Sequence, residues 1–154
     1  MRRILTGLVL ILMLTGGAAA GPFDDGYAAY QRGDYSTALR LWQPSAEQGD
    51  ANAQLSLGIM YAKGQGVPQD YAEAVKWYRL AAEQGQANAQ LSLGTMYANG
   101  QGVPQDYVQA HMWVNLAATK GYDAAIEARK RIAAKMTPAQ IAEAQKLARE
   151  WKPK

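Results

Sequence analysis

Hydrophobic and small residues recur along this chain at helical spacing, and the whole pattern recurs every 36 residues. The stretch Gly49–Tyr71 returns as Gly85–Tyr107 with 20 of 23 positions identical. Within each copy the apolar residues lie three or four positions apart, which is typical of an amphipathic helix rather than of a strand. A fixed period of this length indicates a repeat architecture in which each unit packs on its neighbours.

Each 36-residue unit is predicted to consist of two antiparallel helices joined by a short loop. In the unit 49–84 the apolar spacing places these helices over 51–63 and 71–84, and the unit 85–120 repeats the plan. The intervening loop contains Pro and Gly residues that are typical of turns.

Polar residues stand immediately before the predicted helices, where a side-chain oxygen can accept a free backbone N–H. Asp50 and Asp70 hold such positions. Asp70 is followed by Glu73, and Asp106 by Gln109, which is the spacing of a capping box. We therefore interpret these acidic residues as helix caps and not as catalytic carboxylates.

Two glycines occupy the middle of predicted helices. Gly58 and its repeat equivalent Gly94 each stand where glycine costs about 1 kcal/mol relative to alanine. The same cost at the same place in both units predicts that another helix approaches too closely there for a Cβ atom.

The segment 21–48 is predicted to be a degenerate half-repeat that caps the N-terminal end. A short helix ends at Gly33, and a second runs from Tyr35 to about Gln48 with Asp34 as its cap. Pro44 is expected to kink this second helix.

The segment 121–154 is predicted to be a C-terminal helical cap, because the repeat frame survives there only in Gly121 and Ala125. Thr137 and Pro138 have the residue types that begin a helix. The apolar stripe of this last helix is predicted to be Ile141, Ala144, Leu147, Ala148 and Trp151.

The first 20 residues have the three-part form of a secretory signal peptide. Arg2 and Arg3 precede an apolar run that is too short to span a membrane, and small residues follow up to Ala20. We expect cleavage after Ala20 or nearby, and export of the protein, to the bacterial periplasm or further as a secreted protein.

Charge and cysteine content narrow the chemistry of the remaining chain. Without Arg2 and Arg3 it carries 14 basic and 13 acidic residues, but 120–154 alone carries nine basic and four acidic residues. This basic end could contact an anionic surface, or be a solvated helix face. The absence of cysteine excludes disulfides, cysteine nucleophiles and cysteine metal ligands.

The repeated residues A-x-A-Q-x-x-L-G-x-M-Y-x-x-G-x-G-V-x-x-D-Y-x-x-A-x-x-W-x-x-x-A-A resemble the Sel-one-like repeat (SLR), a relative of the tetratricopeptide repeats. The resemblance covers two units over 51–118 and half a unit over 34–49. It implies an all-α, right-handed α-solenoid of antiparallel helix pairs, with about eight helices after the signal peptide. The signature positions in this chain are Ala53, Leu57, Gly58, Tyr61, Gly64, Gly66, Asp70, Ala74, Trp77, Ala81, Ala89, Leu93, Gly94, Tyr97, Gly100, Gly102, Asp106, Ala110, Trp113 and Ala117.

The resemblance also implies an adaptor or scaffold that binds a protein or peptide, with the first helix of each pair lining a concave face. Residues that the signature leaves free on these first helices are the candidates for binding. The two units differ among them only at Ile59/Thr95 and Lys63/Asn99, so these positions would make the groove asymmetric. The candidates are Asn52, Leu55, Ser56, Ile59, Lys63, Asn88, Leu91, Ser92, Thr95 and Asn99.

No set of residues points to catalysis, a cofactor or a metal. His111, the only histidine, replaces Val75 of the preceding unit, and we interpret it as a packing residue. A lone histidine without cysteine or a helical His/Glu partner is a poor zinc ligand set. The chain also lacks a basic, aromatic-interleaved stripe for nucleic acid.

The sequence therefore predicts an exported binding module and not an enzyme, with an unidentified protein or peptide as its partner. Two alternatives stay open. One is a cell-envelope enzyme or wall-fragment binder, because some cysteine-rich relatives are associated with penicillin binding or β-lactamase activity. The other is a structural assembly unit that stacks through its basic last helix.

Overall fold

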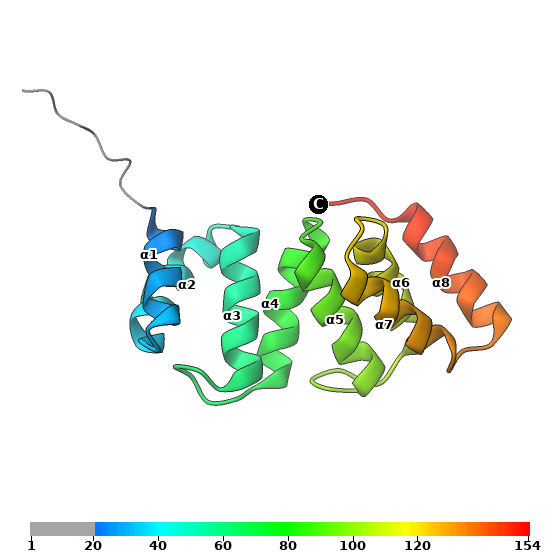
Figure 1. Cartoon of the computed structure of the whole chain (residues 1–154), viewed down its shortest axis with the longest axis horizontal. Helices are drawn as coiled ribbons and strands as arrows, with labels where there is room; N and C mark the ends of the chain where they lie inside the picture. The colour runs from blue at the N-terminus through cyan, green and yellow to red at the C-terminus, as the bar shows by residue number, and fades with distance from the viewer. Residues whose placement is uncertain (1–20) are drawn as a thin grey trace, which may run out of the picture.

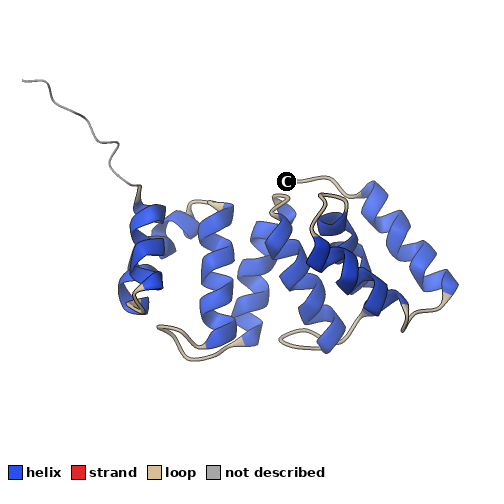
Figure 2. Cartoon of the chain, viewed as in Figure 1, coloured by secondary structure: helices blue, strands red, loops and turns tan. Residues whose placement is uncertain are grey.

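The computed structural model describes residues 21–154, and the predicted signal peptide lies outside this range. These residues form eight α-helices and no strand (Figure 2). The prediction of an all-α fold with about eight helices is confirmed. The helices are α1 (Pro22–Gln31), α2 (Tyr35–Glu47), α3 (Ala51–Lys63), α4 (Tyr71–Glu83), α5 (Ala87–Asn99), α6 (Tyr107–Ala118), α7 (Asp123–Ala133) and α8 (Pro138–Glu150).

The helices form a row in which each one from α1 to α7 packs on the next in chain order (Figure 1). The helix α8 breaks this order, because it packs on α6. The odd-numbered helices α1, α3, α5 and α7 make up what we call the first-helix face, and α2, α4 and α6 the second-helix face. Such a row is a solenoid, in which neighbouring units supply each other with a core.

Single side-chain caps begin most of the helices. The carboxylates of Asp34, Asp50, Asp70 and Asp106 each accept the backbone N–H three residues ahead. The predicted reciprocal capping boxes at Asp70 and Asp106 are not formed. The Glu73 carboxylate instead pairs with Lys76, one turn further along α4.

The helix pairs are closest at the two mid-helix glycines. A Cβ on Gly58 would lie 2.5 Å from ring carbons of Tyr78, and a Cβ on Gly94 would lie 2.5 Å from a methyl of Val114. The Gly94 site is tighter still, because the carbonyl oxygen of Ala110 would be 2.9 Å away. The predicted close approach of the helices is thus confirmed, and it explains why glycine stands here despite its cost in a helix.

The loop between the helices of one unit lies against the preceding unit. A Cβ on Gly102 would clash with the backbone of Tyr71, at the start of α4. In the unit before, the side chain of Gln65 donates a hydrogen bond to the Tyr35 hydroxyl and accepts one from the Tyr30 hydroxyl. The Gly- and Pro-containing loop is therefore part of the junction between units as well as a turn.

A buried glutamine side chain also ties each unit to the one before it. Gln54 donates from its amide to the carbonyl of Ala46, and Gln90 donates to the carbonyl of Ala82. Both side chains are nearly inaccessible to water, and each bond gives a buried amide N–H a partner that it would be costly to lack. These bonds fix how far each first helix can slide along the preceding second helix.

The C-terminal segment covers the last unit from two sides. The helices α7 and α8 both pack on α6. Ala144 and Ala148 of α8 join the core formed by α4, α5 and α6. The indole of Trp151 meets the indole of Trp113 edge-on, with 6.2 Å between ring centroids.

We predict that Gly94→Ala destabilises the protein by about 1–3 kcal/mol through overpacking. Gly58→Ala should cost less, because the Tyr78 ring can shift more easily than the backbone carbonyl of Ala110. Urea unfolding followed by circular dichroism measures both effects.

The matched control is Gly21→Ala, because Gly21 has a negative φ and no atom lies within 4 Å of a Cβ there. Equal stability of the Gly94→Ala variant and this control would contradict close helix approach as the reason for glycine.

Candidate functional site

The first-helix face contains two pockets, and each lies where first helices of successive units come together. One involves α1 and α3, the other α5 and α7. Both are open to solvent and accessible to a partner. They differ in chemistry, and this difference is the most distinctive feature of the face.

The pocket at α1 and α3 has a volume of about 140 Å³ and is mostly apolar. We call it the aromatic pocket. Tyr27 is 52% exposed beside it and presents an aromatic ring to solvent. The Tyr30 ring packs against Trp42, with 5.7 Å between centroids. Its lining residues are Tyr27, Tyr30, Trp42, Ser56, Ile59 and Lys63.

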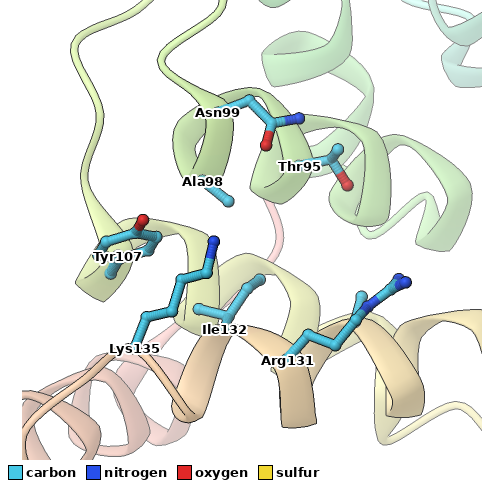
Figure 3. Close-up of a pocket in the computed structure, with 8 residues that line it drawn as sticks. Thr95, Ala98, Asn99, Tyr107, Arg131, Ile132 and Lys135 are labelled. Carbon is cyan, nitrogen blue, oxygen red and sulfur yellow. The ribbon is translucent and has the colours of Figure 1, made fainter.

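The pocket at α5 and α7 has a volume of about 310 Å³ (Figure 3). We call it the cationic pocket, because two basic side chains and no carboxylate line it. Arg131 and Lys135 come from the α7 side, and Thr95 and Asn99 face them from α5. The remaining lining residues are Ala98, Tyr107, Ala128 and Ile132.

The ammonium group of Lys135 lies over an aromatic ring. It lies 5.8 Å from the centroid of the Tyr107 ring, which is a cation–π geometry. Both basic side chains are exposed, so their charges are available to a ligand at the mouth of the pocket. The arrangement can hold a carboxylate or another anionic group by charge and hydrogen bonding.

Five of the ten predicted binding residues line these pockets. Ser56, Ile59 and Lys63 line the aromatic pocket, and Thr95 and Asn99 line the cationic pocket. The positions that differ between the units, Ile59/Thr95 and Lys63/Asn99, are therefore among the lining residues. A binding role for these residues stays a prediction.

The other five predicted residues lie outside both pockets. Leu55 and Leu91 are half-buried and pack on the core. Ser92 lies beside the buried hydroxyl of Tyr78. Asn52 and Asn88 are exposed, and the Asn52 side chain accepts a hydrogen bond from Gln86 in the next unit.

Sequence reasoning missed the aromatic and basic residues that complete the pockets. Tyr27, Tyr30 and Trp42 belong to the N-terminal helices, and Arg131 and Lys135 to the C-terminal segment, which were both interpreted as caps. Tyr27 and the run of basic residues in α7 can be read from the sequence. Their place beside α3 and α5 depends on the packing of the units.

The lone histidine lies in the core, away from both pockets. His111 is 3% exposed, and its Nδ1 atom has no hydrogen-bond partner among the described residues. Burial, with a smaller contribution from the positive charge of Arg129, holds the pKa of His111 below its usual value. Among residues 21–154, no three His, Asp or Glu side chains gather into a possible metal site.

Tyr78, the ring that covers Gly58, is likewise a core residue. Burial raises the pKa of Tyr78 to about 12, although a hydrogen bond with Ser92 acts in the opposite direction. The Tyr78 hydroxyl therefore stays protonated at neutral pH.

Comparison with known proteins identifies the repeats. Residues 24–50, 51–86 and 87–122 match the sequence model of the Sel1 repeat. The first match lies over α1 and α2, the pair that was predicted to be a degenerate half-repeat, and the loop between these helices is short. That loop spans 32–34, compared with 64–70 in the next unit.

Two solved structures resemble the chain throughout most of its length. A protective antigen present in uropathogenic Escherichia coli strains, which displays an SLR fold, matches with a TM-score of 0.80 and 32% identity over 84% of this chain. The match covers 29% of the antigen, so this chain spans less than a third of that protein. A Sel1 repeat protein from Oxalobacter formigenes matches with a TM-score of 0.65 and 36% identity over 71% of this chain and 86% of the relative. No curated protein gives a significant match.

We predict that His111→Val, which installs the residue found at the equivalent position 75, removes a pH dependence of stability. The pKa of His111 is lower in the folded protein than the ordinary 6.5 of the unfolded chain. Below about pH 6.5 the unfolded state therefore binds a proton that the folded state does not. The free energy of unfolding then decreases as the pH is lowered. This loss is complete once the pH is below the folded pKa.

Melting temperatures at pH 7.5 and 5.5 measure the effect. The wild type should lose more stability than His111→Val across this interval. An equal loss in both proteins would show that His111 does not titrate in this way.

Proposed function

Because the chain belongs to the Sel1 repeat family, we propose that it is an exported interaction module that binds a protein or peptide segment along its first-helix face. Sel1 repeat proteins are in general protein–protein interaction modules, and their fold is generally a scaffold without enzymatic activity. Among residues 21–154, none of the helices has the length and apolarity needed to cross a membrane.

One observation carries this proposal: the two pockets of one face are unlike in chemistry. The aromatic pocket suits an apolar side chain, because Tyr27 and Ile59 leave apolar surface exposed there. The cationic pocket suits a carboxylate, because Arg131 and Lys135 have no acidic residue opposite them in it. A segment that lies across α3 and α5 would meet both, with one orientation favoured over the reverse.

The rigid setting of the pockets supports binding by a preformed surface. One wall of each pocket, α3 or α5, is fixed by the glycine contact within its unit and by the buried glutamine bond to the unit before. A surface that does not have to order itself loses less conformational entropy on binding.

Export rests on the sequence of the first 20 residues, with Arg2 and Arg3 before an apolar run. The periplasm of a bacterium is the location that we favour. We predict that the protein recovered from the producing cell has lost these residues and begins at or near Gly21. Intact mass and N-terminal sequencing measure this, and a full-length protein in the cytosolic fraction would contradict export.

We predict that replacing both cations of the cationic pocket, Arg131→Gln with Lys135→Gln, weakens binding of the natural partner at least about tenfold. That corresponds to about 1.4 kcal/mol, which is near the low end of the coupling between close charge pairs at interfaces. The partner is first identified by cross-linking and capture from the cell envelope with residues 21–154. Its affinity is then measured by titration calorimetry.

The matched control is Lys146→Gln with Arg149→Gln, which removes two exposed charges from α8, outside both pockets. This control should bind as the wild type does. If both double variants lose the same affinity, the basic C-terminal segment acts through its overall charge. If neither loses affinity, the cationic pocket is not part of the binding site.

A further inference from the structure

The second-helix face carries a groove that is filled in one unit and open in the unit before it. In the filled place, α8 and the residues after it cover α6 and the end of α4 (Figure 1). Trp151 packs edge-on against Trp113. Its ring would also be 3.8 Å from a Cβ on Gly85, so it lies over the turn that follows α4.

A basic residue completes this contact. The backbone N–H of Lys154 donates to the carbonyl of Glu83 at 2.8 Å, and its ammonium group lies 3.0 Å from the Glu83 carboxylate. The chain's own segment thus supplies an aromatic ring and, three residues later, a cation.

The corresponding place one unit earlier is open. A groove of about 520 Å³ lies between the ends of α2 and α4. Leu80 is 46% exposed beside it, one of the few large apolar side chains exposed among the described residues. Trp77 lines the groove half-buried, whereas its equivalent Trp113 is only 6% exposed beneath Trp151.

The two places share the residues that make the contact. At a separation of 36 residues, the open groove has the same residue type as the filled one at four positions. The identical pairs are Glu47 and Glu83, Gly49 and Gly85, Trp77 and Trp113, and Leu80 and Leu116.

The backbone frame beneath them is the same as well. The carbonyl of Gly49 accepts a hydrogen bond from the side chain of Gln84, as the carbonyl of Gly85 does from Lys120. The open groove therefore repeats the four shared side chains of the filled one, and a glutamine takes the place of the lysine that bonds the glycine carbonyl.

We propose that the open groove binds a segment of another protein that carries an aromatic side chain followed by a lysine or arginine. The aromatic ring would pack on Trp77 over Gly49, and the cation would pair with the Glu47 carboxylate. Glu47 forms no ion pair among residues 21–154, and its exposed carboxylate is complementary to such a cation. Lys154 lines the edge of the groove, so the bound segment would continue the surface that the chain's own segment covers.

A second copy of this chain is a poorer occupant than a separate partner. To offer its Trp151, a copy would have to free that residue from Trp113 and uncover the apolar side of α8. Exposure of that surface would cost more than the short contact returns. The proposal concerns the second-helix face and is independent of binding on the first-helix face.

The test uses a synthetic peptide with the sequence of residues 147–154, Leu-Ala-Arg-Glu-Trp-Lys-Pro-Lys, added to isotope-labelled residues 21–154. We expect millimolar peptide to shift the indole N–H signal of Trp77 and to leave that of Trp113 unchanged. A peptide with alanine in place of its tryptophan should bind at least tenfold more weakly.

Protein variants locate the contact. Leu80→Glu and Glu47→Lys should each weaken peptide binding at least tenfold, and both change exposed residues, so the fold should survive and circular dichroism can confirm it. Glu143→Lys makes the same charge reversal on α8, and Ile59→Thr changes the aromatic pocket. Both controls should bind the peptide normally.

Three results would overturn the proposal. The first is no change at Trp77 with millimolar peptide. The second is a shift at Trp113, which would mean that the peptide displaces the chain's own segment. The third is equal binding by Glu47→Lys and Glu143→Lys. Failure here leaves binding at the first-helix face intact, because Ile59 and the cationic pocket lie on the other helices.

Discussion

The structure depends on the close approach of the two helices within each unit, at a point where a Cβ atom does not fit. Gly58 lies under the ring of Tyr78, and Gly94 under Val114 and the carbonyl of Ala110. A large side chain that packs directly on a glycine backbone leaves little empty space. Dense packing matters in a small protein, because its core buries little surface. Once this distance is set, the positions of the loop, the buried glutamine and the next unit follow from it.

The 36-residue repeat places similar sites along both faces of the solenoid. Each junction between units presents similar backbone surroundings, so a few substitutions are enough to make neighbouring sites differ. Ile59 and Lys63 in one unit are replaced by Thr95 and Asn99 in the next, and the end segments add aromatic rings to the first pocket and two cations to the second. On the second-helix face four groove residues are the same in both units, and the sites differ because Trp151 covers one and leaves the other open.

Local features of the chain were predictable because they depend on neighbours in sequence. The caps at Asp34, Asp50 and Asp70 and the glycines at mid-helix follow from spacing alone. The capping box at Asp70 failed because the Glu73 side chain finds a lysine one turn away, and an exposed carboxylate gains from that charge. The N-terminal pair was predicted to be a degenerate half-repeat, and its two helices pack on each other as the later pairs do.

Pocket residues were harder to predict, since each pocket combines side chains from two successive units that meet only in the folded protein. Helical spacing identifies which residues of α3 and α5 are free, but not that Leu55 and Leu91 lean into the core. Nor does it show that Arg131 and Lys135 come to lie opposite Thr95 and Asn99. The position of α8 on α6, away from its neighbour in sequence, likewise depends on tertiary packing.

The bond between Lys154 and Glu83 has a consequence for how the molecule opens. It joins residues 71 positions apart, and it adds to the packing of α8 on α6 and on the core around α4 and α5. A plain solenoid can fray from either end, one unit at a time. Here the C-terminal residues bind to the end of α4, so α4 to α8 should unfold together as one cooperative block. Fraying is then confined to α1, α2 and α3, and these are the helices that line the aromatic pocket.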